Sequence, residues 1–148
     1  MSRKACSRTG SSMVEFAVGS GILLAAFAGT FQFGYTFIQY NRLETAVSQG
    51  ARYASMAPYD SSTATPSSSF LGAVKNMVTY GNPTPGTSPA LQGLTGGNIK
   101  LDVTFTNGVP ATMTVSITGY SIDALFGKSV LTGKPKVSYP YQGIWTPL

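Results

Sequence analysis

The chain has 148 residues, enough for one domain with a modest core. Charged residues make up 10% of it, well below the roughly 25% of typical soluble domains. It has no histidine, and its single cysteine is Cys6, which excludes His-based catalysis, an internal disulfide and the commonest metal-ligand sets. We therefore expect no enzyme activity, no cofactor and no metal site.

The formal charge of +5 is unevenly placed, because Arg3, Lys4 and Arg8 all lie within the first ten residues. The remainder carries only about +2, and its lysines are scattered rather than gathered into a basic patch with interleaved aromatic residues. This pattern predicts no nucleic-acid partner.

A long apolar segment follows the basic residues. No charged residue occurs from Phe16 to Asn41, and 26 residues of helix span about 39 Å, more than the roughly 20 residues that cross a bilayer. We predict a leader over 1–10 and a transmembrane helix over 11–41. The basic residues before it predict a single-pass protein with a cytoplasmic N-terminus and an exported remainder.

Glu15 stands at the mouth of this segment, where a carboxylate is costly and usually has a role. One interpretation is local: Ser12 and Glu15 can form a capping box at the start of the helix.

Small residues recur at every fourth position on one stripe of the same helix. Small stripes let helices approach closely in lipid, so we predict a helix-packing face, although glycine and alanine are also common in membrane helices. The stripe consists of Ala17, Gly21, Ala25 and Gly29.

A secretory signal cleaved after Ala28 is a rival interpretation, because Ala26-Phe27-Ala28 follows a basic and then an apolar region. Two observations weaken the secretory-signal interpretation. Glu15 interrupts the start of the apolar region, and the uncharged run continues well past Ala28.

The helix is predicted to continue beyond the membrane as an amphipathic helix over 42–57, ended by Pro58. Its apolar positions at helical spacing are Leu43, Val47, Ala51 and Ala54.

Residues 58–148 are predicted to form an exported α+β domain. A second helix is expected over 68–80, followed by a loop over 81–97 that is rich in Gly, Pro, Ser and Thr. Alternating apolar residues then predict a hairpin over 99–118 about Asn107-Gly108, a helical turn over 122–126, and a third strand over 134–141 that Pro140 places at an edge or ends. The fold class is α+β, with a long N-terminal helix packed on a small antiparallel sheet.

No small-molecule site is evident. The three aspartates, Asp60, Asp102 and Asp123, fall in different predicted elements. The segment from Gly93 to Gly97 lacks the Lys-Ser/Thr that a phosphate loop requires.

Three segments resemble the TadE-like pseudopilins, minor pilins of the Tad (Flp-type) pilus system. The first is Gly10, four residues, then Glu15 and Phe16. The second is Phe31-Gln32-Phe33-Gly34-Tyr35, and the third ends in Gly50-Ala51-Arg52-Tyr53-Ala54. Phe16 replaces the tyrosine typical of major Flp pilins, and the exported domain is too large for one.

The resemblance implies a pilin-like fold and cleavage by a prepilin peptidase between Gly10 and Ser11 at the inner membrane. It also implies that Glu15, beside Phe16, becomes the fifth residue of the mature chain and pairs with the amine of a neighbouring subunit. Other pilins, pseudopilins and the Tad assembly platform would be its partners. The alternative function is a membrane-anchored or secreted adhesin that binds through loop 81–97.

Overall fold

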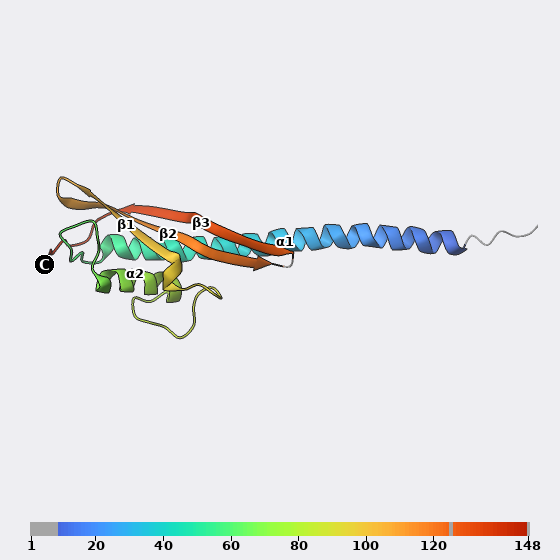
Figure 1. Ribbon diagram of the computed structural model, residues 1–148, viewed down its shortest axis with the longest axis horizontal. Helices are drawn as coiled ribbons and strands as arrows, with labels where there is room; N and C mark the ends of the chain where they lie inside the picture. Colours follow the sequence, from blue (N-terminus) through green and yellow to red (C-terminus); the bar gives the residue numbers. More distant parts are fainter. Residues whose placement is uncertain (1–8, 125, 148) are drawn as a thin grey trace, which may run out of the picture.

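The computed structural model describes residues 9–124 and 126–147, so the basic residues predicted as part of the leader, and Cys6, lie outside the described residues. One long helix projects from a head made of a second helix and a three-stranded antiparallel sheet (Figure 1). This arrangement confirms the predicted α+β class. In chain order the elements are α1 (Thr9–Met56), α2 (Ser68–Tyr80), the 3-10 turn η1 (Gly96–Asn98), β1 (Ile99–Thr106), β2 (Val109–Ala124) and β3 (Gly127–Pro140).

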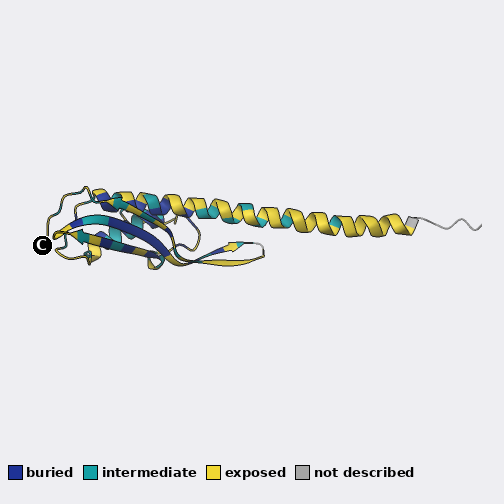
Figure 2. Cartoon of the chain, turned by 90° about the horizontal axis from the view of Figure 1, so that it is seen from above, coloured by how far each residue is buried: buried dark blue, intermediate teal, exposed yellow. Residues whose placement is uncertain are grey.

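Helix α1 is continuous over 48 residues because no proline interrupts it before Pro58. The described residues leave most of its N-terminal half exposed, including large apolar side chains from Met13 to Ile38. Figure 2 shows this half of the helix coloured mainly as exposed. By length and composition this half can cross a membrane. An apolar surface of this size requires a lipid or protein environment that the chain itself does not supply.

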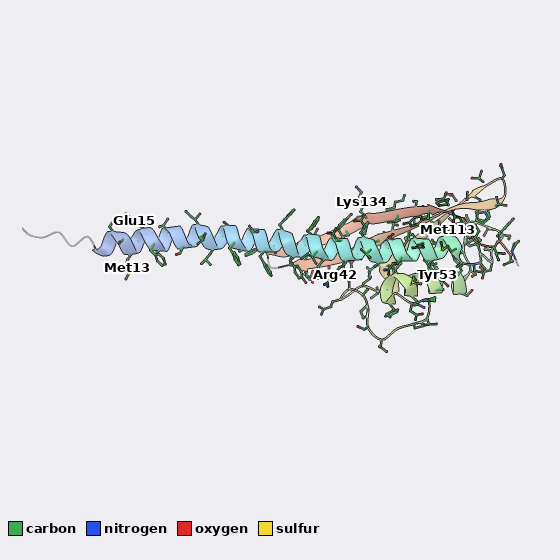
Figure 3. The ribbon with its side chains drawn as sticks, turned by 180° about the vertical axis from the view of Figure 1, so that it is seen from behind. Met13, Glu15, Arg42, Tyr53, Met113 and Lys134 are labelled. Atoms are coloured by element: carbon green, nitrogen blue, oxygen red, sulfur yellow. The ribbon has the colours of Figure 1, made fainter. Side chains whose placement is uncertain are left out.

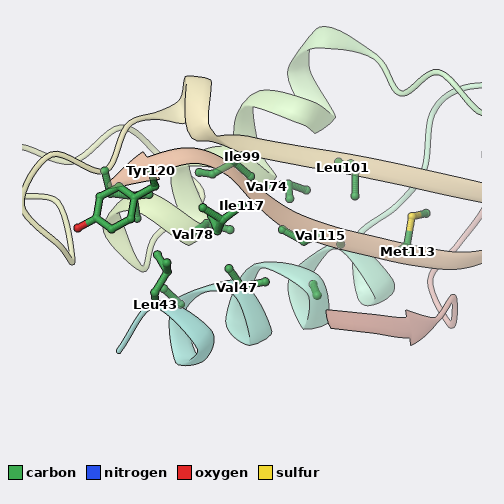
Figure 4. Packing of buried hydrophobic residues seen from close by; sticks show 14 of the residues in the cluster. Leu43, Val47, Val74, Val78, Ile99, Leu101, Met113, Val115, Ile117 and Tyr120 are labelled. Carbon is green, nitrogen blue, oxygen red and sulfur yellow. The ribbon is translucent and has the colours of Figure 1, made fainter. Parts of the chain in front are cut away.

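The C-terminal half of α1 packs against α2 and the sheet. The four positions predicted for its apolar face, Leu43, Val47, Ala51 and Ala54, are fully buried. They belong to one buried cluster with inward side chains of α2 and β2, among them Val74, Val78, Met113, Val115 and Ile117 (Figure 4). This is the hydrophobic core of the head.

Helix α2 has the bounds expected from the sequence. The Ser67 side chain accepts a hydrogen bond from the Phe70 amide at 3.1 Å, which caps the first turn and typically stabilises a helix by about 1 kcal/mol. Gly81 ends the helix in the left-handed conformation, with φ of 71°.

The sheet order is β1-β2-β3, and Asn107 and Gly108 have the positive φ angles, 54° and 80°, that the predicted hairpin turn needs. β3 is an edge strand and ends at Pro140, as expected for a residue that cannot donate to a ladder.

The prediction of a helical turn over 122–126 is wrong. β2 continues to Ala124 and turns directly into β3, with Asp123 opposite Lys128 and Ala124 opposite Gly127. β3 therefore begins seven residues before the predicted Lys134. The period-2 pattern continues in Tyr120 and Ile122, which are both buried, but register shifts on either side of Thr118 hide its continuity in the sequence.

The end of the chain closes over the end of α1. Buried Tyr59 donates its amide hydrogen to the Tyr141 hydroxyl at 2.9 Å, and Thr146 donates to the Tyr59 carbonyl at 3.0 Å. Trp145 Nε1 donates to the Ser61 carbonyl at 3.0 Å. These contacts join segments more than eighty residues apart, so no local pattern predicted them.

Candidate functional site in the N-terminal helix

The predicted cleavage site lies in the first turn of α1. The helix begins at Thr9, and both Gly10 and Ser11 are exposed. A Cβ built on Gly10 would meet no atom within 4 Å. Among the described residues, nothing in the head shields this peptide bond from a peptidase.

Glu15 lies one turn further along the same exposed surface (Figure 3). The Ser11 hydroxyl donates to Glu15 Oε1 at 3.3 Å, and this is the polar contact that the described residues give the carboxylate. Since the carboxylate can accept several hydrogen bonds, the described residues use only a small part of its capacity.

The structure places Ser12 inside α1, whose described part starts at Thr9. A capping box requires Ser12 to be the last residue before the helix, so the uncleaved chain does not form one there. For a chain that starts at Ser11, the capping-box interpretation stays a prediction.

The small-residue stripe lies on the exposed surface of α1. Ala17, Gly21, Ala25 and Gly29 are all exposed, and Cβ atoms built on Gly21 and Gly29 would meet nothing within 4 Å. No described side chain outside α1 covers Gly21 or Gly29, so the stripe presents a surface that another helix could approach closely.

The Gly-Ala-Arg-Tyr-Ala run packs in the head rather than in the membrane segment. A Cβ on Gly50 would overlap the Cγ2 atom of Val78, so only glycine allows α1 and α2 to approach this closely. Ala51 and Ala54 are fully buried, whereas Arg52 is exposed and Tyr53 is half-buried. This motif therefore maintains the contact between the helices.

A polar groove of about 350 Å³ lies where α1, the loop before β1 and the far end of β2 meet. Tyr120 lines it, and burial, reinforced by nearby Tyr35 and Asp123, raises the pKa of the Tyr120 phenol. The neutral hydroxyl donates to the Gln92 carbonyl at 3.0 Å, so Tyr120 fastens the loop to β2.

The three aspartates do not converge. Asp60 accepts hydrogen bonds from Ser67 and Ser69, Asp102 pairs with Lys100 at 2.9 Å, and Asp123 pairs with Lys128 at 3.4 Å. Over residues 9–124 and 126–147, no three His, Cys, Asp or Glu side chains come together as metal ligands would.

Only part of loop 81–97 is exposed to solvent. Leu91 and Leu94 are buried in the core, while residues 84–90 are exposed. The exposed part carries no charged residue and no aromatic side chain. It offers none of the anchors that usually dominate binding energy at protein interfaces.

Comparison with known proteins connects the first helix to a family. No curated protein and no solved structure matches the chain. The family model described as TadE-like protein matches residues 10–52, which is α1 without its ends. The match includes Gly10, Glu15, the small stripe and Gly50, and it excludes α2 and the sheet. The chain is thus TadE-like over residues 10–52, which confirms the resemblance predicted from its sequence.

Proposed function

We propose that the protein is a minor pilin or pseudopilin that takes part in the initiation or assembly of a Tad (Flp-type) pilus. The observation that carries this proposal is the exposed apolar half of α1, a TadE-like helix joined without a break to a folded head. Such a helix needs lipid before assembly and other helices afterwards. A chain of this form can move from membrane to fibre without refolding its head.

In this proposal the N-terminus is cytoplasmic and a prepilin peptidase cuts after Gly10. The new amine of Ser11 and the carboxylate of Glu15 then lie at the same end of the helix. A charge pair between neighbouring subunits fixes their axial register, because an unpaired charge in hydrocarbon is penalised. The small stripe provides the close contact between helices, and the role is structural rather than enzymatic.

Processing tests the proposal directly. When the chain is produced with an active Tad prepilin peptidase, intact mass and N-terminal sequencing are expected to show a mature protein that starts at Ser11. Without the peptidase, the start should remain upstream of Gly10. A start at Gly29 would instead indicate a secretory signal and the adhesin alternative, and an unprocessed chain would indicate a plain membrane anchor.

The small stripe gives a second prediction. Gly21→Leu should weaken crosslinking to partner pilins in membranes by about tenfold, the effect of roughly 1.4 kcal/mol, because leucine prevents close approach of helices. Gly19→Leu is the matched control, since Gly19 has equally open surroundings but lies on the opposite side of α1. Equal crosslinking by both variants at equal membrane levels would mean that the stripe reflects composition only.

A further inference from the structure

The far end of the sheet is a two-stranded ribbon that follows α1 toward its N-terminus. β1 pairs with β2 only as far as Ile117, whereas β2 and β3 remain paired out to Ala124 and Gly127. The β1–β2 hairpin points to the opposite end of the head (Figure 1). The two hairpin turns therefore lie at opposite ends of the sheet.

One hydrogen bond fixes the position of the ribbon tip along α1. The Phe126 amide donates to Gln32 Oε1 at 3.0 Å. Gln32, Thr36 and Gln39 share one face of the helix and are half-buried, while Phe31, Phe33 and Phe37 on the other faces are exposed. The structure thus partly covers a polar stripe within the uncharged segment and leaves Phe31, Phe33 and Phe37 exposed.

The tip stands at a definite distance from the start of the uncharged segment. Gln32 lies sixteen residues after Phe16, which is about 24 Å along a helix, whereas the hydrocarbon core of a bilayer is about 30 Å thick. With Glu15 at the inner boundary, Gln32 and the tip beside it lie about 4 Å inside the outer boundary of the hydrocarbon. Arg42, the next charged residue on α1, lies ten residues and about 15 Å beyond Gln32, outside the hydrocarbon.

The residues of the ribbon tip suit a position near the outer boundary of the hydrocarbon. Phe126 is 69% exposed, and the sequence between Asp123 and Lys128 contains no polar or charged residue. Directly behind this turn, Asp123 and Lys128 form a cross-strand ion pair at 3.4 Å. An apolar turn with charges behind it suits the headgroup boundary, where aromatic side chains concentrate and charges remain hydrated.

We infer that the tip of the β2–β3 ribbon is a second membrane contact, which inserts Phe126 into the outer leaflet beside α1. This inference rests on the proposed membrane insertion of α1. The ion pair limits the depth of insertion to the turn. The contact sets the height of the head above the bilayer.

Tryptophan quenching by lipid tests the contact. The full chain has one tryptophan, Trp145, so Trp145→Phe provides a background for single probes. Phe126→Trp would be compared with Val109→Trp, an exposed site next to the opposite hairpin turn, and with Phe27→Trp in the apolar half of α1. Each chain is reconstituted in phosphatidylcholine vesicles with and without brominated acyl chains.

We expect brominated lipid to remove about half of the emission of the probes at 27 and 126 and to leave the probe at 109 nearly unchanged. Quenching at 27 without quenching at 126 would overturn the tip contact and leave the membrane helix intact. No quenching at 27 would instead overturn the insertion on which the inference rests. A blue-shifted but unquenched probe at 126 would show that another protein surface, such as a second copy, covers the tip.

A second probe avoids any disturbance from the removal of Trp145. Phe126→Cys in a Cys6→Ser chain carries a nitroxide label, whose access to oxygen and to a water-soluble nickel chelate is measured in the same unbrominated vesicles. Greater access to oxygen than to nickel supports the contact, and the reverse overturns it.

Discussion

A chain with Glu15 replaced by glutamine is expected to be processed and inserted normally, yet to leave a complemented deletion strain with at most about a tenth of its surface pili. The substitution keeps size and hydrogen bonding but removes the charge. Breaking a desolvated charge pair by removing one partner typically costs about 3–5 kcal/mol, which is enough to lose register between subunits. Uncharged glutamine also enters the membrane more easily, so a loss of pili cannot be attributed to failed insertion.

Glu44→Gln is the matched control for this experiment. Glu44 is the other acidic residue of α1, and it is exposed in the half that belongs to the head. It should leave piliation unchanged. Surface pili are counted by electron microscopy, and mature protein is measured by immunoblot. Normal piliation with Glu15→Gln would contradict charge pairing, whereas the TadE-like character of residues 10–52 would stand.

Gly50→Ala is expected to lower the free energy of unfolding of the head by about 1–3 kcal/mol, although alanine is the better helix former. A Cβ at this position would overlap Val78, which is fully buried and cannot move aside without disturbing the core. In a head of roughly 100 residues, each kcal/mol shifts Tm by about 4–8 °C. Trp145 fluorescence during thermal unfolding of the detergent-solubilised chain gives the measurement.

The same substitution at Gly72 should act in the opposite direction. Gly72 lies within α2, and a Cβ there would meet nothing within 4 Å, so Gly72→Ala should stabilise the head by up to about 1 kcal/mol. Adding Val78→Ala to Gly50→Ala should recover part of the loss, which a double-mutant cycle would measure. Destabilisation by both glycine substitutions alike would refute the steric explanation.

The sequence predicted the elements whose pattern is local. The 3.6-residue period gave α2 and the buried face of α1, and Asn107-Gly108 located the β1–β2 turn. The far end of β2 was misjudged because a register shift and the left-handed Gly119 interrupt its alternation. The contacts around Tyr59 could not be predicted from the sequence, because they join segments more than eighty residues apart.

The candidate site was predictable in its residues but not in its surroundings. Gly10, Glu15 and Gly50 are recognisable from spacing, because the family pattern is linear along one helix. The sequence did not show that Gly50 faces Val78. It also gave no sign that Phe126 meets Gln32, ninety-four residues earlier, because that contact depends on how far the ribbon extends.

The unbroken course of α1 also determines the direction in which the head faces. α1 is one uninterrupted helix from Thr9 to Met56, and a helix turns by about 100° per residue. The rotation of the head about the helix axis is therefore fixed relative to the N-terminal half. Any rotation of the N-terminal half of α1 about the helix axis rotates the head by the same angle. One residue added between Gln32 and Leu43 would turn the head through more than a quarter of a circle and move the ribbon off its polar stripe. In the proposed fibre, the packing of the N-terminal half of α1 against neighbouring helices would determine the direction in which each head faces.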